Sequence, residues 1–171
     1  AVSVGDTEVT LLRTDPLLTP GYDLLVPAQE APVIWNVLAS SSLGVVFIGE
    51  GTFDLLRIEA GIPRYGWEIS EAVNPWEANL QEYINFEKGC YIGQEVILRL
   101  NTYKKVQKQL MALTFSLDAE VARGDNLYCG DDLAGLVTSV ARRPATGEMI
   151  GLGLIKRTFA VPETELRLDK I

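Results

Sequence analysis

The stretch after Gln109 constrains the fold more than any other part of the chain. Four apolar residues there alternate with smaller or polar ones: Met111, Leu113, Phe115 and Leu117. This two-residue period is typical of a half-buried strand. Turn signals follow at 123–125, 130–132 and 145–147, and short apolar runs lie at 127–129, 136–140, 149–155 and 166–168. Several short strands at this spacing predict a small antiparallel barrel.

The part of the chain before this stretch has a mixed pattern. Two extended runs, at 9–12 and 22–26, are followed by apolar residues with helical spacing: Ala31, Ile34, Trp35 and Leu38. We expect a short buried strand at 45–48 and a second helix at 52–60, with Thr52 as its cap. The predicted fold class is therefore α+β, a sheet backed by helices and followed by the small antiparallel β-barrel.

Two domains follow from this change of pattern. We expect an α+β domain over 1–104 and the barrel over 105–171, with a boundary in the basic connection at 99–108. Further along the first domain, residues 83–86 read as extended and 94–100 as a helix. The chain begins at Ala1 without a Met. We interpret it as a processed chain or a fragment that lacks the N-terminal portion of its first domain.

The composition excludes several kinds of site. The 171 residues carry a formal net charge of -8, which works against broad contact with nucleic acid phosphates. The absence of histidine excludes Ser-His-Asp and Cys-His catalysis within the chain, and no metal site is expected. Two cysteines and no membrane-length apolar stretch indicate a reducing compartment, the cytoplasm or an organelle matrix.

One short run has the composition of a functional loop: Lys88, Gly89, Cys90, Tyr91, Ile92, Gly93, Gln94 and Glu95. A helix is predicted to begin just after Gly93, so Cys90 would lie near the positive end of its dipole and close to the Lys88 ammonium. Both effects favour a thiolate and make Cys90 a candidate functional thiol. The alternative is that Cys90 is a small buried apolar residue, the commoner state of a lone cysteine.

This run resembles the hallmark of YgfZ-type folate-binding proteins, which are relatives of the glycine cleavage T-protein (aminomethyltransferase). Residues 53–63 resemble the Arg-x-Glu-Ala-Gly-x-Pro segment that the two groups share, and 21–23 resembles the T-protein Gly-Tyr-Glu element. Residues 135–139 resemble a strand of the family's C-terminal barrel. The resemblance thus extends over most of the chain.

The resemblance implies a site for tetrahydrofolate or a derivative. Phe53 stands where YgfZ relatives carry a folate-stacking aromatic residue, usually Trp. The resemblance assigns Glu59, Asp23 and Tyr22 to the folate site, with the two carboxylates at the pterin edge, and Arg57 to a carboxylate of the ligand. Phe53 and Tyr22 could equally be core residues, and Arg57 and Glu59 a solvated helix surface.

Three functions are compatible with these residues. The resemblance favours a folate-binding accessory protein, not itself an enzyme, that supports iron–sulfur enzymes, including those that modify tRNA, with an iron–sulfur enzyme or assembly protein as partner. The alternative is an aminomethyltransferase, whose relatives carry Phe-Ile-Gly-Arg-Glu where this chain has residues 91–95 and an N-terminal Asp that this sequence lacks. A third possibility is a noncatalytic interaction module.

Overall fold

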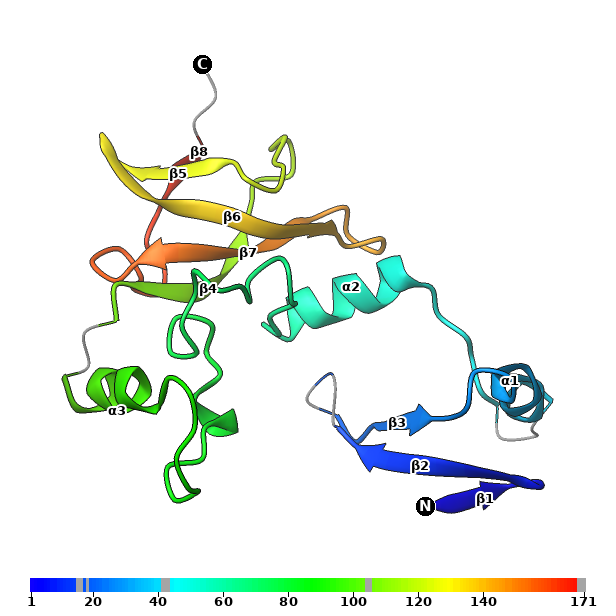
Figure 1. Ribbon diagram of the computed structural model, residues 1–171. Helices are drawn as coiled ribbons and strands as arrows, with labels where there is room; N and C mark the ends of the chain where they lie inside the picture. The colour runs from blue at the N-terminus through cyan, green and yellow to red at the C-terminus, as the bar shows by residue number, and fades with distance from the viewer. Residues whose placement is uncertain (15–16, 18, 41–43, 104–105, 169–171) are drawn as a thin grey trace. The chain divides into compact units, whose positions relative to one another are not determined.

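A computed structural model describes residues 1–14, 17, 19–40, 44–103 and 106–168 of the chain. The chain divides into two compact units, Ala1–Ala60 and Gly61–Ile171 (Figure 1). We call them the N-terminal unit and the C-terminal unit and describe each separately. The domain boundary expected between residues 104 and 105 lies outside the described residues and stays a prediction. These two residues also belong to the basic connection at 99–108.

The N-terminal unit contains a three-stranded antiparallel sheet in the order β1-β2-β3. Its strands are β1 (Val2–Val4), β2 (Thr7–Arg13) and β3 (Tyr22–Leu25). Gly5 adopts φ +61° in the tight turn between β1 and β2, a conformation that a residue with a Cβ rarely takes. Val9 is the buried residue of this sheet. The Thr7 hydroxyl donates to a Glu30 carboxylate oxygen at 3.3 Å, which ties β2 to the start of the following helix.

Two helices follow the sheet, α1 (Ala31–Ala39) and α2 (Glu50–Glu59). Pro32 sits in the first turn of α1, where its missing N–H costs no helical hydrogen bond, and Ile34 is buried. Gly49, rather than the expected Thr52, is the residue that caps the start of α2. Gly61 follows the end of α2 with φ +70°, the left-handed conformation that terminates many helices.

Two local expectations are wrong. Residues 45–48 form no strand, and all four side chains are exposed. These β-forming residues pair with no strand among the described residues, and Phe47 instead stacks on Trp35 of α1 with ring centroids 4.1 Å apart. The extended stretch expected at 83–86 does not form as a whole, because Tyr83 ends the 3-10 helix η1 (Gln81–Tyr83) and a bend begins at Phe86, although Ile84 between them has extended backbone angles. The helix expected at 94–100 is confirmed as α3 (Gln94–Tyr103).

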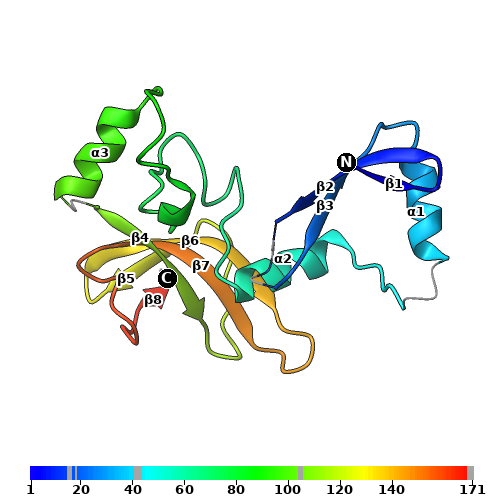
Figure 2. The same cartoon turned by 90° about the horizontal axis from the view of Figure 1, so that it is seen from below.

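The C-terminal unit is built on a five-stranded antiparallel sheet in the order β4-β7-β6-β5-β8. Its strands are β4 (Lys108–Thr114), β5 (Asn126–Cys129), β6 (Asp132–Arg142), β7 (Met149–Lys156) and β8 (Arg167–Leu168). Every residue of β7 except Lys156 is buried, as expected for a strand between two neighbours (Figure 2). The four short apolar runs expected after residue 123 all lie within, or within one residue of, these strands, whereas β4 ends at Thr114, before the last two residues of the alternation, Phe115 and Leu117.

The chain after β7 runs back across the sheet before it reaches β8 beside β5 (Figure 1). We call residues 157–166 the crossing segment. Phe159, Ala160 and Leu166 of this segment pack against the core cluster of Leu127, Val137 and Ile155. The core of the unit therefore lies between the curled sheet and the crossing segment, which gives the barrel-like form. The predicted fold class is confirmed.

The irregular residues 61–80 are fastened to the sheet by buried polar groups. The Glu68 side chain is fully buried and accepts hydrogen bonds from the Arg64 backbone N–H, at 2.9 Å, and from the buried Ser139 hydroxyl. Further along, the Leu110 N–H of β4 donates to the Glu77 carbonyl oxygen at 2.7 Å. Because a buried carboxylate is costly unless its oxygens are bonded, the pair formed by Glu68 and Ser139 fixes where this segment sits on the sheet.

We predict that Gly135→Ala destabilises the C-terminal unit. A Cβ at Gly135 of β6 would clash with the Leu154 carbonyl oxygen and lie 2.9 Å from the Ile155 Cα of the neighbouring strand. Overpacking of this kind should lower the free energy of unfolding, measured in urea, by about 1–3 kcal/mol. The control is Gly89→Ala, because nothing lies within 4 Å of the Cβ it would add. Equal stability of the two variants would contradict this account of the β6–β7 contact.

Candidate functional site

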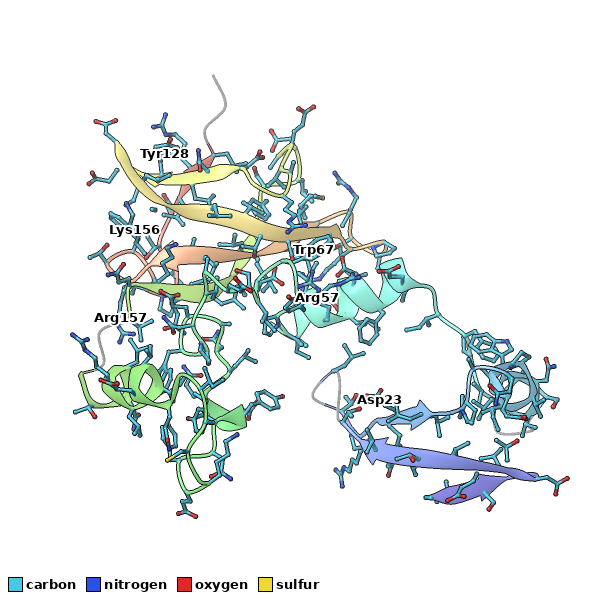
Figure 3. The ribbon with its side chains drawn as sticks, viewed as in Figure 1. Asp23, Arg57, Trp67, Tyr128, Lys156 and Arg157 are labelled. Carbon is cyan, nitrogen blue, oxygen red and sulfur yellow. The ribbon has the colours of Figure 1, made fainter. Side chains whose placement is uncertain are left out.

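Helix α2 brings two of the candidate folate residues onto one face. Phe53 and Arg57 are four residues apart, so their side chains project from the same side of the helix. The Phe53 ring is 42% exposed, whereas the Arg57 side chain is only 3% exposed. Arg57 Nε donates to a carboxylate oxygen of Asp54 at 2.8 Å, which holds the plane of the guanidinium (Figure 3). The result is an exposed aromatic ring beside an oriented cation.

Glu59 lies on a different face of the same helix. Two residues along a helix correspond to a rotation of about 200°, so Glu59 projects nearly opposite to Arg57. Glu59 is exposed, in contrast to the buried Arg57. The structure therefore places Phe53 and Arg57 on one face of α2 and Glu59 on another. The spacing of Arg57 and Glu59, two residues apart on a helix, already predicts this separation.

Strand β3 carries the other two candidate folate residues. Tyr22 is opposite Arg13 of β2, and Asp23 is opposite Leu12. Consecutive residues of a strand point to opposite faces of the sheet, and both of these side chains are exposed. A flat ligand lying on one face of the sheet would therefore meet one of these two side chains. Figure 3 labels Asp23 on β3 and Arg57 on α2, which are separate elements of the N-terminal unit.

The signature run, residues 88–95, forms an exposed loop that leads into α3. Asn85 opens the loop, since its side-chain oxygen accepts the N–H groups of Glu87 at 2.9 Å and Lys88 at 3.0 Å. Gly93 closes it with φ +88°, and its carbonyl oxygen accepts the Ile97 N–H at 3.1 Å in the first helical turn. The conformation explains why glycine stands at position 93.

Within this loop the charged and reactive groups are accessible. The Lys88 ammonium lies 4.5 Å from the centroid of the Tyr91 ring, a cation–π contact, rather than directly on the cysteine. Cys90 is a free, exposed thiol, and Gly89 beside it is exposed as well. Gln94 and Glu95 fall in the first turn of α3, where a carboxylate suits the helix dipole. All of these motif residues belong to the C-terminal unit.

Sequence reasoning missed a cluster around Trp67 in the C-terminal unit. The guanidinium carbons of Arg64 and Arg123 lie 5.4 Å and 4.2 Å from the centroid of the Trp67 ring. Arg123 Nη2 also donates to the Gly66 carbonyl oxygen at 2.7 Å. The sequence feature that could have revealed this cluster is a tryptophan within an irregular stretch that contains Gly and Pro, because such a side chain often packs the loop against the rest of the domain. The buried pair of Glu68 and Ser139 was missed too, because residues 71 positions apart leave no local pattern.

Across residues 1–14, 17, 19–40, 44–103 and 106–168, no group of three or more His, Cys, Asp or Glu side chains could hold a metal ion. No helix formed by the residues that the structure describes has the length and apolar character needed to cross a membrane.

Comparison with known families gives two matches along the chain. The model of the GCVT N-terminal domain matches residues 1–88, and that of the glycine cleavage T-protein C-terminal barrel domain matches residues 108–170.

Several curated relatives are named aminomethyltransferase. The chain is 30% identical to the one from Anoxybacillus flavithermus over 98% of its own length and 47% of the relative's. It is 32% identical to the one from Chlorobium limicola over the same shares, 98% and 47%. It is 31% identical to the one from Halalkalibacterium halodurans over 96% and 46%. The chain thus spans about half the length of these relatives.

A solved structure has the same fold. It is the glycine cleavage system aminomethyltransferase T from Bartonella henselae, with a TM-score of 0.81 and 22% identity. The match covers 94% of this chain and 45% of that one.

These findings correct the function expected from the sequence. They place the chain among T-protein relatives but give no support to a YgfZ-type member, an iron–sulfur partner or a role in tRNA modification. Relatives that align with nearly the whole chain are named as enzymes, so the expectation of a non-enzymatic accessory protein is wrong. The expectation depended on the residue types at 91–95, which differ from the T-protein pattern. So short a loop carries less information about function than similarity over the whole chain.

We predict that Cys90 is alkylated before Cys129. Cys90 is exposed in the loop before α3, whereas Cys129 is half-buried at the end of β5. Brief treatment with iodoacetamide near neutral pH, followed by peptide mass spectrometry, should label Cys90 first. In a Cys90→Ser variant the rapid phase should disappear. Preferential labelling of Cys129 would refute the prediction.

Proposed function

Because the chain belongs to the glycine cleavage T-protein family, we propose that it supplies the folate-contacting part of an aminomethyltransferase. The observation that carries this proposal is the similarity to aminomethyltransferases over 96–98% of the chain. Proteins of this family use tetrahydrofolate. Because the chain spans about half the length of those relatives, we propose the activity for a protein that contains this sequence together with a part like the one that the relatives have in addition.

In this chemistry a one-carbon unit passes from an aminomethyl group to folate, and the amine leaves. The role that we propose for this chain in the reaction is to bind the folate. On α2 the exposed Phe53 ring offers an apolar surface for the pterin, and the Arg57 guanidinium offers a partner for a carboxylate of the ligand. Asp23 or Tyr22 on β3 offers a hydrogen bond to the polar edge of the pterin, whereas Glu59, on the opposite face of α2 from Phe53, is left out of this assignment.

The geometry of α2 supports this assignment. A folate carries both a flat ring system and negatively charged carboxylates, and the face of α2 pairs an exposed ring with a cation. The ion pair with Asp54 fixes the plane of the guanidinium but occupies its Nε, and the side chain is only 3% exposed, so a ligand carboxylate would have to reach the remaining N–H groups. The signature loop of the C-terminal unit is proposed as a functional element in its own right, with Cys90 as its accessible thiol.

A reducing compartment fits the two free cysteines, and we propose the cytoplasm or an organelle matrix.

A ring-deletion variant tests the stacking role of Phe53. Titration of the chain with tetrahydrofolate in a calorimeter should give saturable heat, and Phe53→Ala should weaken binding about tenfold because stacking area is lost. Phe47→Ala is the matched control, since Phe47 is an aromatic residue of the same unit that is 43% exposed. Absence of binding by the unmodified chain, or an equal loss in both variants, would overturn the assignment.

The role of Arg57 is tested by comparing two ligands. Arg57→Lys keeps the charge but removes the planar group that binds carboxylates at two points. We expect this variant to bind tetrahydrofolate several-fold more weakly and to bind a tetrahydropterin without a glutamate tail as well as the unmodified chain does. Equal losses for both ligands would show that Arg57 acts through the structure of α2 instead.

A chimera tests the activity itself. The part of the Anoxybacillus flavithermus aminomethyltransferase that this chain does not cover would be joined to this chain, and aminomethyltransferase turnover measured. We expect turnover, and a loss of at least about tenfold in kcat/KM when the chimera carries Phe53→Ala. A folded chimera that binds folate but has no turnover would contradict the proposed enzyme while leaving the folate site standing.

A further inference from the structure

The outer edge of β4 in the C-terminal unit is only partly covered. Within the part of the chain that the structure describes, β4 pairs with β7 alone. Leu110 directs its backbone groups away from β7, since its N–H donates to the Glu77 carbonyl oxygen and its own carbonyl oxygen accepts Asn79 Nδ2 at 2.9 Å. By the antiparallel alternation, Ala112 and Thr114 also direct their backbone groups to this side.

A cavity of about 320 Å³ lies beside this edge, between β4 and residues 163–168. A smaller hollow of about 70 Å³ adjoins it. Five residues line both spaces: Ala112, Leu113, Glu163, Thr164 and Leu166. We call the combined space the seam cavity. Its size is at the lower end of the range for small-molecule sites.

The floor of the seam cavity is apolar. Leu127 belongs to the buried core cluster, and Leu113 and Leu166 pack against that cluster. All three side chains line the larger space. A ligand that fills it must therefore have an apolar part, because a buried polar group would find no partner on this surface.

Two polar residues that line the seam cavity, Glu163 and Thr164, which we call its rim, offer hydrogen-bond acceptors to a ligand. Glu163 contributes a carboxylate, and its φ of +65° is one that a residue with a Cβ adopts at a cost in energy. The Thr164 hydroxyl donates its proton to the Val161 carbonyl oxygen at 2.8 Å, so toward a ligand its oxygen can only accept. Arg167, the basic residue closest to Glu163 in sequence, instead donates to the Gly130 carbonyl oxygen at 3.2 Å and lies over the Tyr128 ring.

We propose that the seam cavity binds a small organic cation, namely a primary amine with an unbranched apolar tail. The ammonium group donates hydrogen bonds to the Glu163 carboxylate and the Thr164 oxygen at the rim. The tail lies against Leu113 and Leu166 on the floor. An anion of the same length is disfavoured, because it would face the Glu163 carboxylate across a partly enclosed space. This site shares no residue with the proposed folate site, whose residues all lie in the N-terminal unit.

Three probes of equal length test the proposal. The isotope-labelled chain would be titrated with n-hexylamine, n-hexanol and hexanoate, and the amide resonances followed by two-dimensional NMR. We expect saturable shifts at residues 112–116 and 161–168 with hexylamine, binding about fivefold weaker with hexanol, and none with hexanoate. Shifts of equal affinity for amine and carboxylate, no saturable shifts, or shifts confined to other residues would overturn the proposal.

Variants separate the rim from the floor. Glu163→Gln should remove the preference for hexylamine over hexanol while both still bind. Glu165→Gln is the matched control, because Glu165 is an exposed acid two residues away that does not line the cavity. Ala112→Trp should block both hexylamine and hexanol by filling the space from the strand edge, with the amide spectrum showing that the unit stays folded. Equal effects of Glu163→Gln and Glu165→Gln would mean that the negative charge of the protein surface, and not this cavity, attracts the amine.

Discussion

The buried carboxylate of Glu68 holds the C-terminal unit in its observed form. It accepts hydrogen bonds from the Arg64 backbone on one side and the Ser139 hydroxyl on the other, and both Glu68 and Ser139 are fully buried. Loss of either partner would leave a polar group without compensation in the interior. Through this contact, residues 61–80 gain a fixed position on the sheet, Trp67 comes within reach of Arg123, and Glu77 meets the edge of β4.

The elements with a clear period could be predicted from sequence, and those that depend on distant partners could not. The alternation from Met111 to Phe115 reflects one face packed on the core, and the helical spacing from Ala31 to Leu38 has Ile34 as its buried residue, so β4 and α1 were expected. Residues 45–48 have strong β propensity, yet propensity decides little without a partner strand. The contact of Glu68 with Ser139 lies between segments far apart in sequence and has no signature in either.

The candidate site shows a similar division. Similarity of short segments to the T-protein family identified the residues that we assign to folate. The geometry of the helix and the strand then decides which of these side chains share a face and can contact one ligand. Phe53 and Arg57 share a face of α2, Glu59 does not, and Tyr22 and Asp23 point to opposite faces of β3. The family branch was the least predictable feature. It depended on a few residues of one short loop, whereas the family follows from similarity over nearly the whole chain.

The strand order of the C-terminal unit has a consequence for how the chain acquires its fold during synthesis. Strand β4 emerges first, yet among the described residues it pairs only with β7, where Lys108 meets Lys156 and Thr114 meets Ile150. Until β7 has been made, the apolar face of β4 has no sheet to join, and β5 and β6 can form only a hairpin. The unit should therefore fold late and in one step, and β4 is a point of aggregation risk in the nascent chain.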